Sequence, residues 1–247
     1  MTNSRNNHFV NSAPIRIKFR QTIFQFNWEQ NRKKYSQIII VSFCNVGPNL
    51  IKYMTKKNQD QKNIKTLKDY GAYGLEVPSE MIGWLRSDHA GETGAVWIYK
   101  GAICAFWSRK IRKMAENHIK TEIDHLTVMS HLVPIYNQSK LIFLWKVMGF
   151  SLGFLSALFG FSTFCITINA VETFVEDHYK TQVTKLRDMG SNKDLLGVLE
   201  RCCEDEIHHK LDAKQNIRNS KYGLITLTWV KIVSTGSGLA VKVSSKI

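Results

Sequence analysis

The stretch Leu199-Glu200-Arg201-Cys202-Cys203-Glu204-Asp205-Glu206-Ile207-His208-His209 decides the fold class of this chain. It contains the spacing Glu206-x-x-His209, and the same spacing occurs far upstream as Glu122-x-x-His125. Residues three apart on a helix project from one face, so each pair directs a carboxylate and an imidazole toward one point. One such spacing arises by chance in many helices, whereas two copies in one chain are a much stronger signal.

A single glutamate precedes each pair by a similar distance. Glu92 lies 30 residues before Glu122, and Glu172 lies 34 residues before Glu206. The resulting order, Glu, Glu-x-x-His, Glu, Glu-x-x-His, is that of four-helix bundles that hold two metal ions in a carboxylate site. The expected fold is therefore all-α, a ferritin-like four-helix bundle. The six candidate metal ligands are Glu92, Glu122, His125, Glu172, Glu206 and His209.

Four glutamates on inward-facing helical stripes require compensating positive charge. An ionised carboxylate loses several kcal/mol of solvation when it is buried, and neighbouring carboxylates repel one another. Two bound metal ions remove both penalties. Mixed oxygen and nitrogen ligands favour iron or manganese, dioxygen chemistry favours iron, and zinc usually takes fewer ligands.

A competing pair lies beside the second Glu-x-x-His motif. Asp205 and His208 have the same spacing as Glu206 and His209. We favour the latter pair because it continues the apolar stripe that begins at Leu195.

The remaining acidic and histidine residues have simpler interpretations. His89 is expected near the start of a helix or beside a ligand. His178 and Tyr179, which follow Glu172 on the same expected helix, are candidate catalytic residues that contact the ligands or take part in redox chemistry. Residues expected to be solvated, or to serve surface or packing roles, are Glu176, Glu200, Glu204, His118 and His131.

The net charge of +14 over 247 residues is unevenly distributed. Residues 1–59 hold ten Lys and Arg residues but only one acidic residue, Glu29. This composition predicts a mitochondrial targeting segment and linker over residues 1–60, with a disordered basic tail as the alternative. Because most of the charge lies outside the expected fold, we expect no nucleic-acid partner. The five scattered cysteines lack a C-x-x-C spacing, which favours a reducing compartment over a disulfide framework.

Apolar periodicity predicts the helices. The first begins near Ser79 or Ser87, after a polar approach, and the second covers residues 115–136. Residues 141–168 are apolar and contain several glycines; we expect a helix or broken helix in a membrane interface, with a bilayer-spanning segment as the alternative. A turn near Gly160 then leads into a helix over residues 162–188. A further helix follows Asn192 in a plausible N-cap, and the tail holds an apolar run over 224–233 and a separate closing helix over 239–247.

The motifs resemble those of the demethoxyubiquinone hydroxylase family, the ferritin-like di-iron monooxygenases of ubiquinone biosynthesis. The resemblance covers roughly residues 79–247, the expected hydroxylase domain. Cys202-Cys203 and His208 depart from the family pattern near the fourth ligand segment. The matching blocks are Ser87-Asp88-His89-Ala90-Gly91-Glu92, Glu122-x-Asp124-His125-Leu126, Ala170-Val171-Glu172 with His178-Tyr179, and Asp205-Glu206-x-x-His209.

This resemblance implies an activity and its partners. The family hydroxylates the ring of a demethoxy-ubiquinol with dioxygen at two iron ions, and NADH supplies the reducing equivalents. It works with a lipid-binding partner protein in a ubiquinone biosynthetic complex, as a peripheral protein on the matrix side of the mitochondrial inner membrane. The apolar residues 141–161 would let the enzyme take its substrate from the membrane surface.

Two other functions fit parts of the pattern. A ferritin-like peroxidase or iron oxidase would keep the metals, but it would not need the apolar insert. A non-enzymatic basic helical scaffold would bind a membrane or nucleic acid through residues 1–59, without metal.

Overall fold

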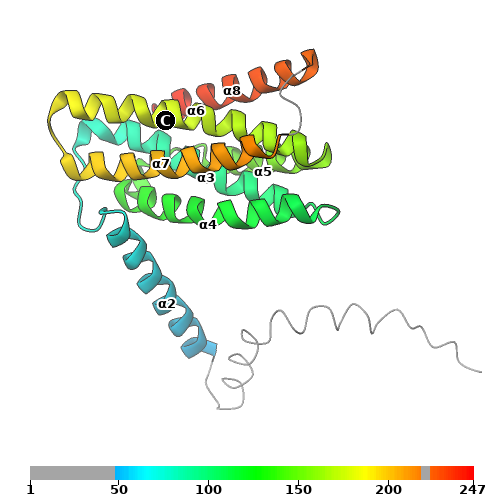
Figure 1. Ribbon diagram of the computed structural model, residues 1–247. Helices are drawn as coiled ribbons and strands as arrows, with labels where there is room; N and C mark the ends of the chain where they lie inside the picture. Colours follow the sequence, from blue (N-terminus) through cyan, green and yellow to red (C-terminus); the bar gives the residue numbers. More distant parts are fainter. Residues whose placement is uncertain (1–47, 218–222) are drawn as a thin grey trace, which may run out of the picture. The chain divides into compact units, whose positions relative to one another are not determined.

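A computed structural model describes residues 48–217 and 223–247, and every regular element within these ranges is a helix (Figure 1). The chain divides into two units, residues 1–58 and 59–247, and the second contains all six candidate ligands. The predicted targeting segment lies mostly outside the described residues and stays a prediction. Helix α2, Pro48–Asp69, runs through the expected boundary at residue 60 and into the stretch that we expected to be a polar approach.

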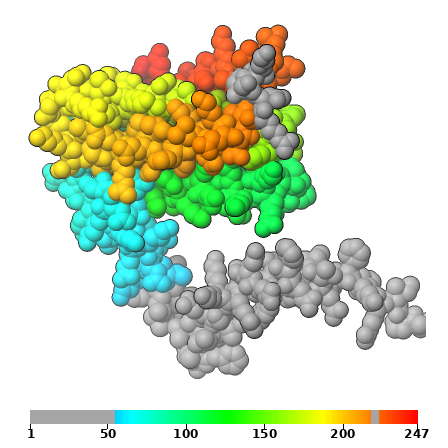
Figure 2. Space-filling model, in the orientation of Figure 1, coloured from blue at the N-terminus to red at the C-terminus, as the bar shows by residue number. Residues whose placement is uncertain are grey.

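Four helices form the bundle: α3 (Ile82–Ile103), α4 (Arg109–Leu132), α6 (Phe161–Met189) and α7 (Lys193–Gln215). Helix α3 packs against α4, and α6 packs against α7, as two antiparallel hairpins (Figure 1). Helix α5 (Ile142–Leu158) makes the long crossover between the hairpins, which is the connection of ferritin-like folds. The expected all-α ferritin-like class is confirmed. In Figure 2 the helices α6 (yellow), α7 (orange) and α4 (green) follow one another from top to bottom.

Local chemistry explains where these helices begin and end. Helix α4 starts at Arg109, earlier than predicted, because the hydroxyl of Ser108 accepts a hydrogen bond from the Ile111 amide at 3.4 Å. It stops at Leu132, two residues before Pro134. Asn192 occupies the N-cap position of α7 as predicted, but its side chain caps no backbone amide because the residue is left-handed, with φ 58°.

Helix α5 lies unusually close to α3. A Cβ atom on Gly149 would lie 2.4 Å from the carbonyl oxygen of Gly94, and one on Gly153 would lie 1.8 Å from that of Ile98. The two contacts are four residues apart on both helices, so α5 runs in the same direction as α3. Gly160, with φ 98°, then makes the predicted turn into α6. Residues 141–168 are therefore divided between α5, which packs on α3, and the first turns of the bundle helix α6, and they do not form the one continuous helix that the bilayer-spanning alternative required.

Helix α8 (Leu224–Ser244) is continuous, which corrects the predicted break at Gly236 and Gly238. It packs against α3 and α6. Within residues 48–217 and 223–247, it is the one helix with the length and apolar composition to cross a membrane. Its first residues, Leu224 and Ile225, are 81% and 88% exposed.

The apolar core has two parts, and the candidate ligands lie between them. On α7, Glu206 and His209 are bounded by Leu199 in one part and Ala213 in the other. The equivalent apolar residues on α4 are Met114 and Val128, on either side of Glu122. The bundle thus encloses a polar layer in an otherwise apolar interior.

Candidate metal centre

The structure brings all six predicted ligands together in the centre of the bundle. Glu92 comes from α3 and Glu172 from α6, while α4 and α7 each supply a Glu-x-x-His pair. Each side chain is buried, with at most 6% of its residue surface exposed. They form two groups within which one ligand atom from each residue lies within 4.8 Å of the others: Glu92, Glu122, His125 and Glu206, and Glu122, Glu172, Glu206 and His209.

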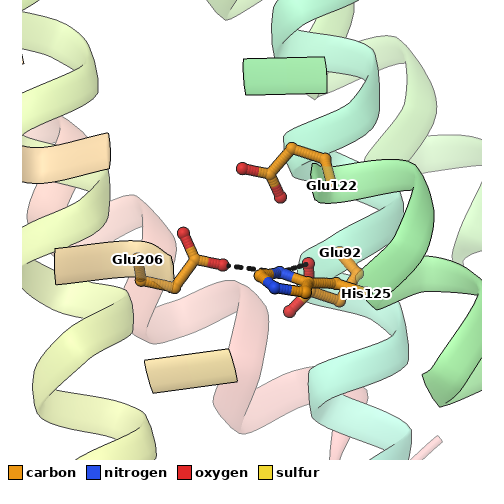
Figure 3. A group of neighbouring side chains, drawn as sticks. All are labelled: Glu92, Glu122, His125 and Glu206. Atoms are coloured by element: carbon orange, nitrogen blue, oxygen red, sulfur yellow. Dashed lines mark hydrogen bonds and ion pairs between the residues drawn. The ribbon is translucent and has the colours of Figure 1, made fainter. Parts of the chain in front are cut away.

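The first group surrounds the imidazole of His125 (Figure 3). Its Nδ1 atom lies 3.0 Å from Oε1 of Glu206 and 3.6 Å from Oε2 of Glu92. In Figure 3 the carboxylate of Glu122 lies above the imidazole ring. Carboxylates of α3 and α7 therefore converge on one ring nitrogen, and Glu122 of α4 has a ligand atom within 4.8 Å of theirs.

The second group is built around His209. Its Nδ1 atom lies 2.9 Å from Oε1 of Glu122 and 3.3 Å from Oε2 of Glu206. Glu172 completes the group and accepts a hydrogen bond of 2.9 Å from the hydroxyl of Tyr99. Glu122 and Glu206 belong to both groups, so they connect the two halves of the site.

Several of these buried atoms lack a hydrogen-bond partner among the described residues. They include both carboxylate oxygens of Glu122, Oε2 of Glu206 and Nδ1 of His209. The contacts at 2.9 and 3.3 Å bring these atoms close without hydrogen-bond alignment. A buried polar atom without a partner costs roughly 1–3 kcal/mol. The donor set of oxygen and imidazole nitrogen, without a thiolate, fits a pair of iron or manganese ions that would satisfy all of these atoms.

Without metal ions, the protein would neutralise the negative charge of the buried carboxylates by binding protons. Burial, and then the charge of Glu206, raise the pKa of Glu122 to about 8. Burial and the same neighbour raise the pKa of Glu172 well above its usual range. Burial alone would lower the pKa of His209, but the carboxylates of Glu122 and Glu206 raise it to about 11. Cations at this position would replace these protons.

Two neighbours orient the imidazole rings. The Nε2 atom of His125 lies 3.1 Å from Oδ2 of Asp205, so that Nδ1 faces the ligand cluster. A metal ion bound at Nδ1 would leave the ring proton on Nε2, where the carboxylate of Asp205 accepts it. The ring of His118 stacks on that of His209 with centroids 4.3 Å apart. Its nitrogens contact Asp212 at 2.8 Å and the Tyr99 hydroxyl at 3.1 Å.

These neighbours show what sequence reasoning missed. Asp205 was given a possible role only as half of a competing pair with His208, whereas His208 is exposed and Asp205 contacts the ligand His125. His118, expected on the surface or in packing, is buried four residues before Glu122, a helical spacing that signals a shared face. Tyr99 lies two turns after Glu92 on the same helix, a spacing that places both side chains on the buried face of α3.

Glu176 is also a correction, because the residue predicted to be solvated is 7% exposed. Its carboxylate accepts from Lys180 at 2.5 Å and also pairs with Lys210. The two lysines explain how a carboxylate outside the ligand cluster stays charged in this position, and they lower its pKa although burial opposes the change.

The two candidate catalytic residues on α6 differ in their distance from the ligands. Tyr179 is buried and its hydroxyl donates to Oε1 of Glu92 at 2.5 Å. His178 reaches Asp88, with 2.8 Å between Nε2 and Oδ1, and does not contact a ligand directly within the described residues. Their chemical roles stay predictions.

A cavity of about 450 Å³ adjoins the ligand cluster. Its walls are predominantly apolar side chains of α3, α5, α6 and α8, and it reaches Glu92, Glu172 and Glu206. Asp88, Trp145 and Ser244 also line it; each has one buried side-chain atom without a hydrogen-bond partner among the described residues. The arrangement suits a largely apolar ligand with a few polar groups beside a metal centre.

Comparison with known proteins identifies the relatives of this chain. Residues 79–244 match the family model described as ubiquinone biosynthesis protein COQ7. The chain is 35% identical over 132 residues to the mitochondrial NADPH-dependent 3-demethoxyubiquinone 3-hydroxylase of Dictyostelium discoideum, which covers 51% of this chain and 59% of the relative.

Two further relatives match over longer stretches. The enzyme with the same name from Caenorhabditis elegans is 29% identical over 167 residues, which is 66% of this chain and 88% of the relative. The 3-demethoxyubiquinol 3-hydroxylase of Rhodospirillum rubrum is 28% identical over 178 residues, 70% of this chain and 82% of the relative. The family match covers more than half of the chain and all six candidate ligands. The chain therefore belongs to the COQ7 family of ubiquinone biosynthesis proteins.

Proposed function

We propose that this protein is a 3-demethoxyubiquinol 3-hydroxylase, a dioxygen-dependent di-iron monooxygenase of ubiquinone biosynthesis. The observation that carries the proposal is the pair of buried ligand groups that share Glu122 and Glu206 and open on an apolar cavity. The family and the printed activities of the relatives support the same reaction.

The six ligands would hold two iron ions. Glu92 and His125 would serve one ion, Glu172 and His209 the other, and Glu122 and Glu206 both. When bound, the iron pair supplies the two electrons with which dioxygen is split, so that one oxygen atom enters the quinol ring and the other leaves as water. The chain keeps the imidazole Nδ1 atoms and the carboxylates turned toward a common space and excludes bulk water from it.

The cavity would bind the quinol ring and the first part of its apolar tail. Its apolar walls suit the tail, and its polar atoms suit the ring oxygens. The indole Nε1 of Trp145 is a donor, Oδ2 of Asp88 is an acceptor, and the hydroxyl of Ser244 is either. The Tyr179 hydroxyl, bonded to Glu92, would hold that carboxylate in place beside the ring.

A nicotinamide cofactor would supply the reducing equivalents. The resemblance to the hydroxylase family implies NADH, whereas the names of the eukaryotic relatives specify NADPH. The chain has no G-x-G-x-x-G motif after a strand, so we propose that the electrons reach the iron through the bound quinone rather than through a separate nucleotide domain.

We further propose that the protein acts as a peripheral protein on the matrix side of the mitochondrial inner membrane. Residues 1–60 would direct import, and residues 79–247 would form the hydroxylase domain. Apolar residues exposed on α5 and α8, including Phe143 at 79% and Leu224 at 81%, would contact the membrane surface next to the cavity that these helices line. A lipid-binding partner protein of the biosynthetic complex would work beside the same surface.

The decisive assay supplies the iron-loaded full chain with demethoxy-ubiquinol in vesicles, ¹⁸O₂, and either NADH or NADPH. We expect one labelled oxygen atom in the quinol ring. Glu206→Ala should abolish hydroxylation and lower the iron content, while the matched variant of the exposed neighbour, Glu204→Ala, should retain both. Reduction of added peroxide, or oxidation of Fe²⁺, without ring hydroxylation would instead support a ferritin-like peroxidase or iron oxidase.

A further inference from the structure

Helix α2 ends beside the metal centre in a motif that fixes the next residues. The amide of Ala72 donates to the carbonyl of Leu67 at 2.8 Å, and the amide of Gly71 donates to that of Lys68 at 3.1 Å. This is the Schellman pattern, and Gly71 supplies the left-handed residue that it requires, with φ 75°. Tyr70 is therefore held at the helix C-cap, immediately before the chain reverses.

Tyr70 contacts the ligand His125 both directly and through Asp205. Its hydroxyl donates to Oδ2 of Asp205 at 2.7 Å, and this same oxygen lies 3.1 Å from Nε2 of His125. The tyrosine ring and the imidazole also form a T-shaped contact, with centroids 5.6 Å apart and an interplanar angle of 86°. The guanidinium of Arg201 covers the tyrosine ring at 4.5 Å.

The end of α2 is anchored to both helices that carry a Glu-x-x-His pair. Thr66 donates to Asp124 of α4 at 3.2 Å, and Arg201 of α7 donates to the carbonyl of Asp69. Leu67 and Ala72 are buried in the core. In Figure 2 this segment, in cyan, lies against α7 and α4. The C-terminal end of α2 is therefore packed against the bundle, which fixes the position of Tyr70.

We propose that Tyr70 is a positioning residue for the metal centre: by fixing Asp205, it holds the imidazole of His125 with Nε2 toward Asp205 and Nδ1 toward the ligand cluster of Glu92 and Glu206. The proposal rests on the proposed metal site. Tyr70 precedes residues 79–244, so this support comes from outside the part of the chain that matches the family.

The geometry explains why the hydroxyl matters. The side chain of Asp205 is 31% exposed, so without a second hydrogen bond it can turn toward water and leave the imidazole without a fixed partner. Loss of such a partner typically lowers metal affinity by about 10–100-fold. Because Tyr70 acts through Asp205, we expect its hydroxyl to contribute at the lower end of that range.

The test titrates Co²⁺ into the metal-free full chain and follows the visible absorption of the bound ion. Tyr70→Phe removes only the hydroxyl, and Tyr73→Phe is the matched control because Tyr73 is 56% exposed and contacts no ligand. We expect Tyr70→Phe to weaken one of two Co²⁺ equivalents by about tenfold and to change its spectrum, and Asp205→Ala to weaken the same equivalent by about 10–100-fold. In the Asp205→Ala background, Tyr70→Phe should change the affinity by less than about twofold.

Each other outcome contradicts the proposal in a recognisable way. If wild-type protein binds two Co²⁺ ions and Tyr70→Phe binds them with unchanged affinity and spectrum, Tyr70 has no positioning role and the metal site stands. If Tyr70→Phe weakens binding equally with and without Asp205, the hydroxyl acts through general packing. If wild-type protein binds no Co²⁺, the proposed metal site fails together with this inference.

Discussion

Replacing Gly153 by alanine tests the close packing of α5 on α3. The added Cβ would lie 1.8 Å from the carbonyl oxygen of Ile98 and 2.6 Å from its carbonyl carbon. A carbon–oxygen contact needs about 3.3 Å, so α5 would have to move by about 1.5 Å. The obstruction is helix backbone and cannot rotate away, as a flexible side chain could.

We expect this displacement to cost at least about 1–3 kcal/mol of unfolding free energy. For a domain of this size that corresponds to a lower melting temperature by about 2–4 °C for each kcal/mol. The cavity should change as well, because Leu152 and Leu155, which flank Gly153, line its wall. Urea denaturation followed by circular dichroism measures the stability.

Gly197→Ala is the matched control, since Gly197 is a helical residue of α7 whose Cβ would meet no atom within 4 Å. There, alanine should stabilise the protein by roughly 0.5–1 kcal/mol, because glycine weakens a helix interior. If Gly153→Ala is as stable as Gly197→Ala, α5 does not pack on α3 as described and the cavity wall is wrong.

Three further predictions address the site and its surroundings. Between about pH 6.5 and 8 the metal-free protein should lose stability as pH rises, because the pKa values of Glu122 (about 8) and His209 (about 11) exceed their unfolded values and the folded state therefore binds more protons. Urea unfolding at pH 6.5 and pH 8 measures this change, and a free energy of unfolding that rises with pH would contradict a buried, acidic site. Trp145→Phe should raise the KM for the quinol about fivefold, the effect of losing one hydrogen bond, while the protein still binds two Fe²⁺ ions. An unchanged KM would show that the indole does not bind the substrate. Glu176→Ala should destabilise the protein by about 1–3 kcal/mol in thermal unfolding. Glu200→Ala should cost less than about 1 kcal/mol, because the ion pair between Glu200 and Arg187 is exposed, and equal effects of the two substitutions would mean that Glu176 is solvated.

The ligand cluster was predictable because helical geometry links spacing to direction. Glu206 and His209 continue a stripe that begins with Leu195, so the sequence alone placed both side chains in the core. The turn at Gly160 was predictable for a similar local reason, since glycine tolerates its positive φ.

The remaining features depend on contacts between distant segments. Asp205 and Tyr70 are 135 positions apart in the chain, and no local pattern reports their hydrogen bond. Glu176 looked solvated because its partner Lys210 lies 34 residues away on another helix. Helix α8 looked broken at Gly236, yet the helix continues through this residue because its neighbours pack against α3 and α6.

The most direct test of the central claim is a stoichiometric Fe²⁺ titration of the metal-free chain under anaerobic conditions. We predict two equivalents for the wild-type protein, loss of tight binding of both in Glu122→Ala, and loss of one in His125→Ala, because Glu122 belongs to both ligand groups and His125 to one. Fewer than two equivalents in the wild type, or two tightly bound ions in Glu122→Ala, would contradict the account.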